Sequence, residues 1–198
     1  EHFSQQPYSY LRFGYIGESA GGVAVLWTAR PYLYNIYRRS FGTDARQPDA
    51  AVALYPGCGE RNTTDRFLPV STMIISGEAD NETPAEYCRT YTEWINSRGG
   101  TTTFLSLPNQ HHDFDAPFQA ARAPNAENPI KCLSKIDGNK RTWEITGEVF
   151  SNDAAGYQAY KRKCLDAGKT IVVVAGHSGN SKTGFPEWLN FFQSKLLK

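Results

Sequence analysis

The residues best suited to chemistry in this sequence are a serine, an aspartate and a histidine that follow predicted strands. Ser19 follows the apolar residues 13–16, Asp80 follows residues 70–76, and His112 follows residues 101–107. A serine hydroxyl becomes a strong nucleophile when a histidine takes its proton and an acid orients that histidine. The three residues therefore predict attack on a carbonyl group, with Ser19 as nucleophile, His112 as base and Asp80 as acid.

Ser19 lies in the pentapeptide Gly17-Glu-Ser-Ala-Gly21, which matches a nucleophile elbow between a strand and a helix. Such a turn lifts the hydroxyl clear of the sheet, and its glycines avoid backbone collisions. The pattern alone also arises by chance in a glycine-rich turn, so the inference depends on the apolar strand before it and the helix-compatible residues 23–27 after it. The backbone N–H of Ala20 is the predicted oxyanion donor.

Several other residues compete for these roles. Glu78 and Glu82 flank Asp80, but Asp80 holds the natural acid position after the strand and its turn. His111 is the rival of His112, which we favour because it directly precedes Asp-Phe. Residues 172–179 imitate a second elbow around Ser178, but the closing glycine is missing and no histidine follows. The required order of nucleophile, acid and histidine eliminates this segment.

The elements that must position these residues alternate along the chain. Continuous apolar runs at residues 50–55 and 70–76 predict buried parallel strands, and residues 101–107, rich in Thr and Phe, predict a further strand. Thr83 as cap, Pro84 and Glu86 predict the start of a helix that runs to about Arg98. Since the carboxyl ends of parallel strands open on one side, the three side chains are expected at one sheet edge. We predict one α/β domain over residues 1–198, with a mainly parallel sheet flanked by helices.

The part of the chain after the loop of His112 differs from the rest in its pattern of turn-forming residues. Prolines and an Asp137-Gly138 turn predict a peripheral hairpin insertion at about residues 124–150. A helix over residues 153–167, a last strand over residues 170–175 and a terminal helix over residues 186–197 then follow.

Composition excludes several classes of partner. The chain has 198 residues and a net charge of +1, without a long run of one sign, so a nucleic-acid partner is not expected. No apolar stretch approaches the roughly 20 residues that span a bilayer, so no membrane partner is expected. Neither a metal nor a cofactor is predicted.

The four cysteines, Cys58, Cys88, Cys132 and Cys164, allow three sets of two pairings. An even number favours two disulfides and a secreted or periplasmic protein, whereas four reduced thiols in a cytoplasmic protein are the alternative. Cys58 and Cys88 follow the strand ends nearest the acid loop, so a disulfide there is favoured over a reactive thiol.

Four motifs in order, over residues 13 to about 118, resemble the dienelactone hydrolase family. They are Tyr15-Ile-Gly-Glu-Ser-Ala-Gly-Gly, Ala53-Leu-Tyr-Pro-Gly-Cys58, Ser76-Gly-Glu-Ala-Asp80 with its Thr-Pro-Ala-Glu-Tyr-Cys88 helix start, and Asn109-Gln-His-His-Asp-Phe-Asp. The resemblance implies an α/β-hydrolase fold without metal, and a triad at Ser19, Asp80 and His112. The namesake enzymes have cysteine at the position of Ser19, so carboxylic esters or lactones in general are the expected small-molecule substrates. A catalytically inactive binding module with the same fold is the alternative.

The position of the elbow leads to a further expectation. In the α/β-hydrolase fold the nucleophile strand is the fifth of about eight, and the loop after the third strand supplies half of the oxyanion hole. Here the nucleophile strand begins near residue 13. The chain is therefore expected to be the C-terminal portion of the fold, with its N-terminal strands on a separate or cleaved chain.

Overall fold

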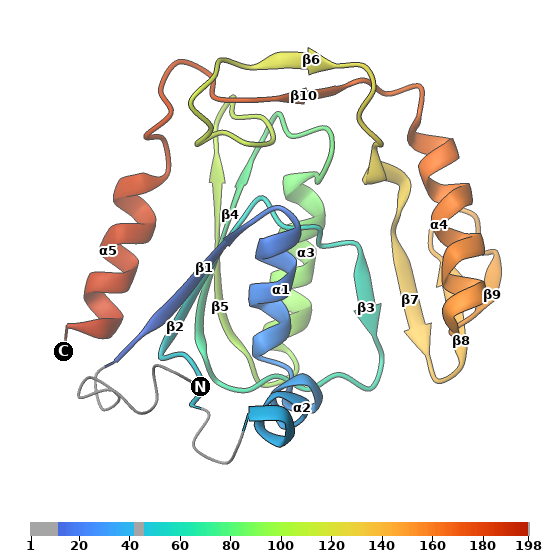
Figure 1. Cartoon of the computed structure of the whole chain (residues 1–198), viewed down its shortest axis with the longest axis horizontal. Coiled ribbons are helices and arrows are strands. Elements are labelled where there is room, and N and C mark those ends of the chain that lie inside the picture. The colour runs from blue at the N-terminus through green and yellow to red at the C-terminus, as the bar shows by residue number, and fades with distance from the viewer. Residues whose placement is uncertain (1–11, 42–45, 198) are drawn as a thin grey trace.

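A four-stranded parallel sheet forms the centre of the protein (Figure 1), which was analysed as a computed structural model that describes residues 12–41 and 46–197. The strands are β1 (Gly14–Glu18), β2 (Ala50–Leu54), β4 (Ser71–Gly77) and β5 (Thr101–Leu107), and their order in the sheet is β1-β2-β4-β5. Every neighbouring pair is parallel. The carboxyl ends of all four strands therefore lie along one edge.

Helices cover both faces of this sheet (Figure 1). Helices α1 (Ala20–Thr28) and α3 (Ala85–Asn96) pack on one face, and α5 (Phe185–Leu196) packs on the other. In β2, Ala51 and Ala53 face the first layer, whereas Val52 and Leu54 face the second, so the strand is buried throughout. The protein is thus a mixed α/β structure with a flanked parallel sheet, consistent with the predicted α/β-hydrolase-like fold. Helix α2 (Pro31–Phe41) follows α1 and was not anticipated.

The segment with the predicted hairpin forms a second sheet with a strand of the central domain. Its strands are β3 (Glu60–Asn62), β7 (Ser134–Asp137), β8 (Lys140–Trp143) and β9 (Val149–Ser151). The hairpin expected at Asp137-Gly138 is the antiparallel pair β7–β8, but β7 also pairs in parallel with β3. A short helix, η1 (Pro129–Lys131), precedes these strands, and α4 (Ala154–Gly168) packs against them. The segment is therefore joined to the loop that follows β2.

The strand expected at residues 170–175 lies outside the main sheet. It is reduced to β10 (Val173–Ala175), which pairs antiparallel with β6 (Ala121–Ala123). Directly after β10, the Gly176 N–H donates to the His112 carbonyl at 2.7 Å. This segment therefore braces the histidine loop instead of extending the parallel sheet.

One disulfide lies in each of the two parts of the chain. Cys58 in the loop after β2 pairs with Cys88 of α3, and Cys132 after η1 pairs with Cys164 of α4. The sequence had left these pairings open. Disulfides persist in oxidising environments, which the two bonds therefore indicate for this protein. Among the described residues, no helix combines the length and the apolar character that crossing a bilayer requires.

Candidate active site

The structure brings together the three side chains that the sequence singled out. His112 Nε2 lies 3.0 Å from Ser19 Oγ, and His112 Nδ1 lies 2.9 Å from Asp80 Oδ2. Ser19 follows β1, Asp80 follows the end of β4, and His112 follows β5, so the parallel sheet places them at one edge. With Nδ1–H donating to Asp80, Nε2 is free to accept the Ser19 proton.

Ser19 adopts a strained backbone conformation. Its φ is +48°, in a region that residues other than glycine rarely adopt, and its N–H donates to Leu54 O at 3.0 Å. A Cβ on Gly17 would lie 2.4 Å from Gly21 O, so glycine is required there. By contrast, a Cβ on Gly21 would meet nothing within 4 Å, and the second tight glycine is Gly22. A side chain would therefore meet close neighbours at Gly17 and Gly22, but not at Gly21, the second glycine of the predicted pentapeptide.

Backbone strain gathers around the same sheet edge. Among the described residues, the non-glycine residues with positive φ are Ser19, Tyr55, Asn109 and Asp113. Each follows the carboxyl end of β1, β2 or β5. Such conformations cost roughly 1–3 kcal/mol each and persist where the surrounding structure fixes them, which is typical of functional sites.

Ala20 is placed where the sequence predicted an oxyanion donor. It is the first residue of α1, and Ser19 is the N-cap of that helix. N–H groups in the first turn of a helix have no intrahelical acceptor and lie at the positive end of the helix dipole. The Ala20 N–H can therefore donate to an oxygen that becomes negatively charged beside Ser19.

Donors surround the Asp80 carboxylate. Its Oδ1 accepts from the backbone N–H groups of Glu82 and Thr83, both at 2.8 Å, and its Oδ2 lies 2.9 Å from the Thr83 hydroxyl. Asp80 is 5% exposed, so these donors stabilise a charge that water does not reach freely. Thr83 was predicted to cap the following helix, and its contact with Asp80 was not predicted. An Asp side chain often accepts from backbone N–H groups two or three residues later. The Asp-x-x-Thr spacing is therefore the sequence signal that could have predicted the contact between Asp80 and Thr83.

The surroundings of His112 favour its protonated form. Burial lowers the pKa of His112, but the hydrogen bond and charge of Asp80, together with the charges of Glu82 and Asp113, raise that pKa above its ordinary value. The ring of Tyr55 packs edge-on against the imidazole, with ring centres 4.8 Å apart. The Tyr55 hydroxyl in turn donates to Asp115 at 2.6 Å, which fixes the ring in place.

The competing residues take other positions. His111 Nδ1 lies 3.0 Å from Ala79 O, and Glu78 accepts from the Ser106 hydroxyl at 3.0 Å. Glu82 lies closer to the site, with Oε2 3.8 Å from His112 Nε2. In the imitation elbow, the backbone N–H of Ser178 donates to Gln110 Oε1 at 3.1 Å.

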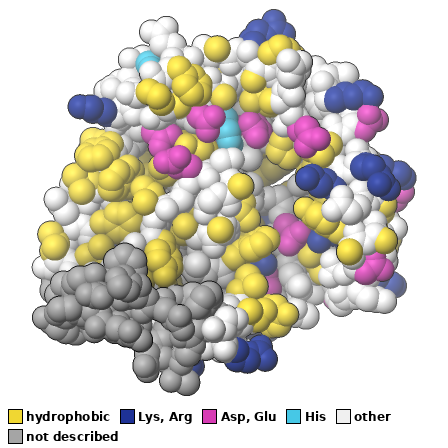
Figure 2. Space-filling view, in the orientation of Figure 1, with side chains coloured by type: hydrophobic (Ala, Val, Ile, Leu, Met, Phe, Trp, Pro, Cys, Tyr) yellow, Lys and Arg dark blue, Asp and Glu magenta, His cyan; other side chains and the backbone are white. Residues whose placement is uncertain are grey.

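Acidic side chains lie close to His112, since Glu82 and Asp113 lie 3.8 and 3.9 Å from its Nε2. Figure 2 shows a group of acidic side chains on both sides of a histidine. Burial, followed by the charges of Asp115 and Asp113, raises the pKa of Glu18. Burial likewise raises the pKa of Glu82. Negative charge at the mouth of the site disfavours anionic ligands. Within residues 12–41 and 46–197, no three His, Cys, Asp or Glu side chains are arranged to hold a metal ion.

Comparison with known proteins adds a limited likeness. No protein-family model matches the sequence. No curated protein matches it either. A search of solved structures found a novel thermophilic esterase from the Planctomycetes species Thermogutta terrifontis, with 21% identity and a TM-score of 0.40. The match covers 51% of this chain and 45% of that one, so the chain spans less than half of that esterase.

Proposed function

We propose that the protein is a serine hydrolase that cleaves carboxylic esters or lactones, related to the dienelactone hydrolase family. The observation that supports this proposal best is the chain of contacts from Asp80 through His112 to Ser19, with distances of 2.9 and 3.0 Å. The strained φ of Ser19 and the adjacent helix N-terminus at Ala20 agree with the same role.

The reaction has two acyl-transfer steps. Ser19 Oγ attacks the ester carbonyl as His112 Nε2 takes its proton, and the oxygen of the tetrahedral intermediate accepts from the Ala20 N–H. The intermediate collapses to an acyl-enzyme, and His112 returns the proton to the leaving alcohol. A water molecule then gives its proton to His112 and attacks the acyl carbon. This second intermediate releases the acid as His112 returns the proton to Ser19 Oγ, which restores both residues. Asp80 holds the Nδ1–H tautomer throughout.

Substitution of the nucleophile tests this proposal. We expect Ser19→Ala to lower kcat for p-nitrophenyl acetate by about 1,000-fold or more while the protein stays folded. Ser178→Ala is the matched control, because Ser178 lies in the imitation elbow, and it should retain wild-type kcat. Equal activity of the Ser19→Ala variant and the wild type would refute the assignment.

Covalent labelling separates this function from a binding module that only keeps the fold. A fluorophosphonate reacts with an activated serine and stays attached to it. We expect one label per chain, on Ser19 by peptide mass spectrometry, and none on Ser178. An unlabelled Ser19 in folded protein would favour the inactive binding module.

We also propose that the protein works outside the cytoplasm, in a secreted or periplasmic setting, because all four cysteines are disulfide-bonded. Protein taken from its natural source and treated with a thiol-alkylating reagent before reduction should carry no label on cysteine. Labelling of Cys58 or Cys132 under those conditions would point to a reducing compartment.

A further inference from the structure

A cavity of about 370 Å³ begins next to the proposed catalytic residues. Ala20, Glu82 and Thr83 line this end of it. Glu82 Oε2 lies 3.8 Å from His112 Nε2, which is itself 3.0 Å from Ser19 Oγ. An organic group bonded to a carbonyl at Ser19 therefore has this cavity within reach, and Figure 2 shows the surface hollowed beside the acidic group.

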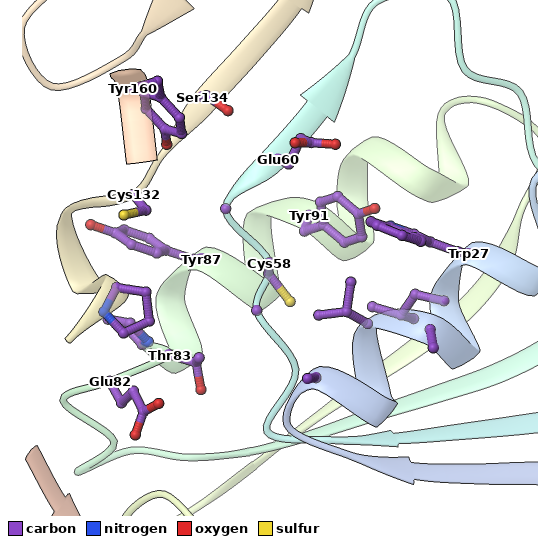
Figure 3. Close-up of a pocket in the computed structure, with 18 of the residues that line it drawn as sticks. Trp27, Cys58, Glu60, Glu82, Thr83, Tyr87, Tyr91, Cys132, Ser134 and Tyr160 are labelled. Carbon is purple, nitrogen blue, oxygen red and sulfur yellow. The ribbon is translucent and has the colours of Figure 1, made fainter. Parts of the chain in front are cut away.

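The walls of the cavity carry aromatic rings from three helices. Trp27 comes from α1, Tyr87 and Tyr91 come from α3, and Tyr157 and Tyr160 come from α4. Figure 3 shows four of these rings, Trp27, Tyr87, Tyr91 and Tyr160, distributed around the space. Aromatic rings favour edge-on or offset contacts with another ring. Pockets of roughly 300–1,000 Å³ hold ligands of ring size or larger.

The segment from η1 to α4, which lines one side of the cavity, is hydrogen-bonded to the loop that carries Asp80. Asn128 is 1% exposed, and its side-chain amide donates to Asn81 O at 3.0 Å and to Ile171 O at 2.8 Å. Within this segment, the Cys132–Cys164 disulfide joins the cavity-lining Cys132 to α4. Because Asn81 directly follows Asp80, the cavity is preformed relative to the triad. Preformed walls lower the entropic cost of binding.

Polar groups mark the two ends of the cavity. Glu82 lies at the end beside His112, and Glu60 lies on the opposite side (Figure 3). Arg141 donates to Glu60 Oε2 at 2.7 Å, and a carboxylate accepts hydrogen bonds at both oxygens. Ser134, near Glu60, adds a hydroxyl to the lining. Glu82 disfavours an anionic ligand at its end of the cavity. Glu60 is paired with Arg141, and its other carboxylate oxygen can accept from a hydroxyl group.

Resting on the proposed ester hydrolysis, we propose that the substrate carries an uncharged aromatic group with a ring hydroxyl, and that this cavity binds it. The protein is then an esterase for hydroxylated aromatic esters. The rings of α1, α3 and α4 contact the aromatic face, and the hydroxyl donates to Glu60. The segment from β7 to α4 lines the part of the cavity that binds the aromatic group, and it therefore determines substrate specificity.

Substrate series test this inference in the wild-type protein. Methyl 4-hydroxybenzoate and methyl acetate differ in the acyl group, and 4-hydroxybenzyl acetate and ethyl acetate differ in the alcohol. With each rate divided by that of alkaline hydrolysis, we expect kcat/KM to favour the aromatic member at least tenfold in one of the two pairs. Monomethyl terephthalate, which carries a ring carboxylate, should be at least tenfold worse than methyl 4-hydroxybenzoate. No aromatic preference in either pair, with Ser19-dependent hydrolysis of methyl acetate intact, would overturn the inference and leave the proposed function standing.

A cavity-filling variant adds a second test. Ala24 lines the cavity and is exposed on α1, so Ala24→Trp fills space without burying a larger side chain in the core. We expect it to lower the ratio of kcat/KM for the favoured aromatic ester over its aliphatic partner by at least tenfold. Ala167→Trp, at an exposed position of α4 outside the cavity lining, is the matched control and should keep the wild-type ratio. Equal ratios in both variants would contradict the inference.

Binding without turnover keeps the inference testable if hydrolysis fails. In the Ser19→Ala protein, calorimetric titration with methyl 4-hydroxybenzoate and with 4-hydroxybenzyl acetate should give saturable binding of at least one of these two esters. The same titration of the Ser19→Ala, Ala24→Trp double variant should give at least tenfold weaker binding. Absence of binding to the single variant would overturn the cavity assignment, whereas binding without any hydrolysis by wild-type protein would refute only the proposed reaction.

Discussion

The hydroxyl of Thr83 lies 2.9 Å from Asp80 Oδ2, the same carboxylate oxygen that faces His112 Nδ1. In the proposed mechanism, Thr83 therefore positions Asp80, which in turn orients His112. Thr83→Val removes this contact while it keeps the shape of the side chain. Because a hydrogen bond to a charged group contributes about 1.5–3 kcal/mol, we expect kcat for p-nitrophenyl acetate to fall by about 10-fold or more.

A conservative substitution distinguishes this role from a loss of packing. Thr83→Ser keeps the hydroxyl and lacks only the methyl group, so it should recover most of the kcat that Thr83→Val loses. If Thr83→Ser is as impaired as Thr83→Val, the methyl contact accounts for the loss and the positioning role is wrong.

The pH profile should report the charges around His112. His112 acts as a base only when neutral, and its raised pKa places the acidic limb of kcat/KM above the ordinary value of 6.5. Glu82 contributes to that shift, since its charge favours the imidazolium. Glu82→Gln removes the charge, so the acidic limb should move to lower pH.

The exposed Glu86 on α3 provides the control for this measurement, because it pairs with Arg89 and makes no contact with His112. Glu86→Gln should leave the acidic limb where the wild-type protein has it. A limb that moves upward in Glu82→Gln, or does not move at all, would contradict the assigned electrostatics.

The two glycines of the pentapeptide should differ in their tolerance of a side chain. Gly17→Ala places a Cβ 2.4 Å from Gly21 O, and strain of this kind lowers the free energy of unfolding by about 1–3 kcal/mol. Gly21→Ala meets nothing within 4 Å and lies in α1, where alanine is favoured over glycine by about 0.5–1 kcal/mol. Urea denaturation should thus show a lower midpoint for the first variant only.

Each disulfide should contribute measurably to stability. Cys58–Cys88 and Cys132–Cys164 span sequence separations of 30 and 32 residues, for which loop closure predicts about 3–4 kcal/mol each. Replacement of either pair with alanines should lower the free energy of unfolding by about that amount in urea denaturation. Midpoints equal to that of wild-type protein would show that the unfolded chain is restricted by other means.

Much of the central fold could be predicted because its signals are local. Continuous apolar runs predicted β2 and β4, since strands buried on both faces need no polar alternation. The Thr- and Phe-rich residues 101–107 predicted β5. Helix α3 was expected from its Pro84 and Glu86 pattern, yet Thr83 does not cap it, and the helix begins at Ala85 without a side-chain cap. The Thr83 hydroxyl contacts Asp80 instead, because a buried carboxylate that lacks donors carries a high energetic cost.

Weaker local patterns failed where pairing depends on distant segments. The three residues of β3 carry no strand signal by themselves, and β3 forms because β7, more than 70 residues later, pairs with it. Likewise, the apolar residues around Val173 predicted a last strand but did not indicate its partner. The antiparallel pairing with β6 placed them beside the His112 loop.

The sequence by itself determined the order of Ser19, Asp80 and His112 and their places after successive strands, because parallel strands send their carboxyl ends to one edge. Only the tertiary structure decided which cysteines pair, that Thr83 and Tyr55 hold the acid and the histidine, and that aromatic rings of three helices enclose a cavity beside the serine. The reason is physical: a strand or an elbow depends on neighbours in sequence, whereas a cavity wall depends on residues that meet only after the chain has folded.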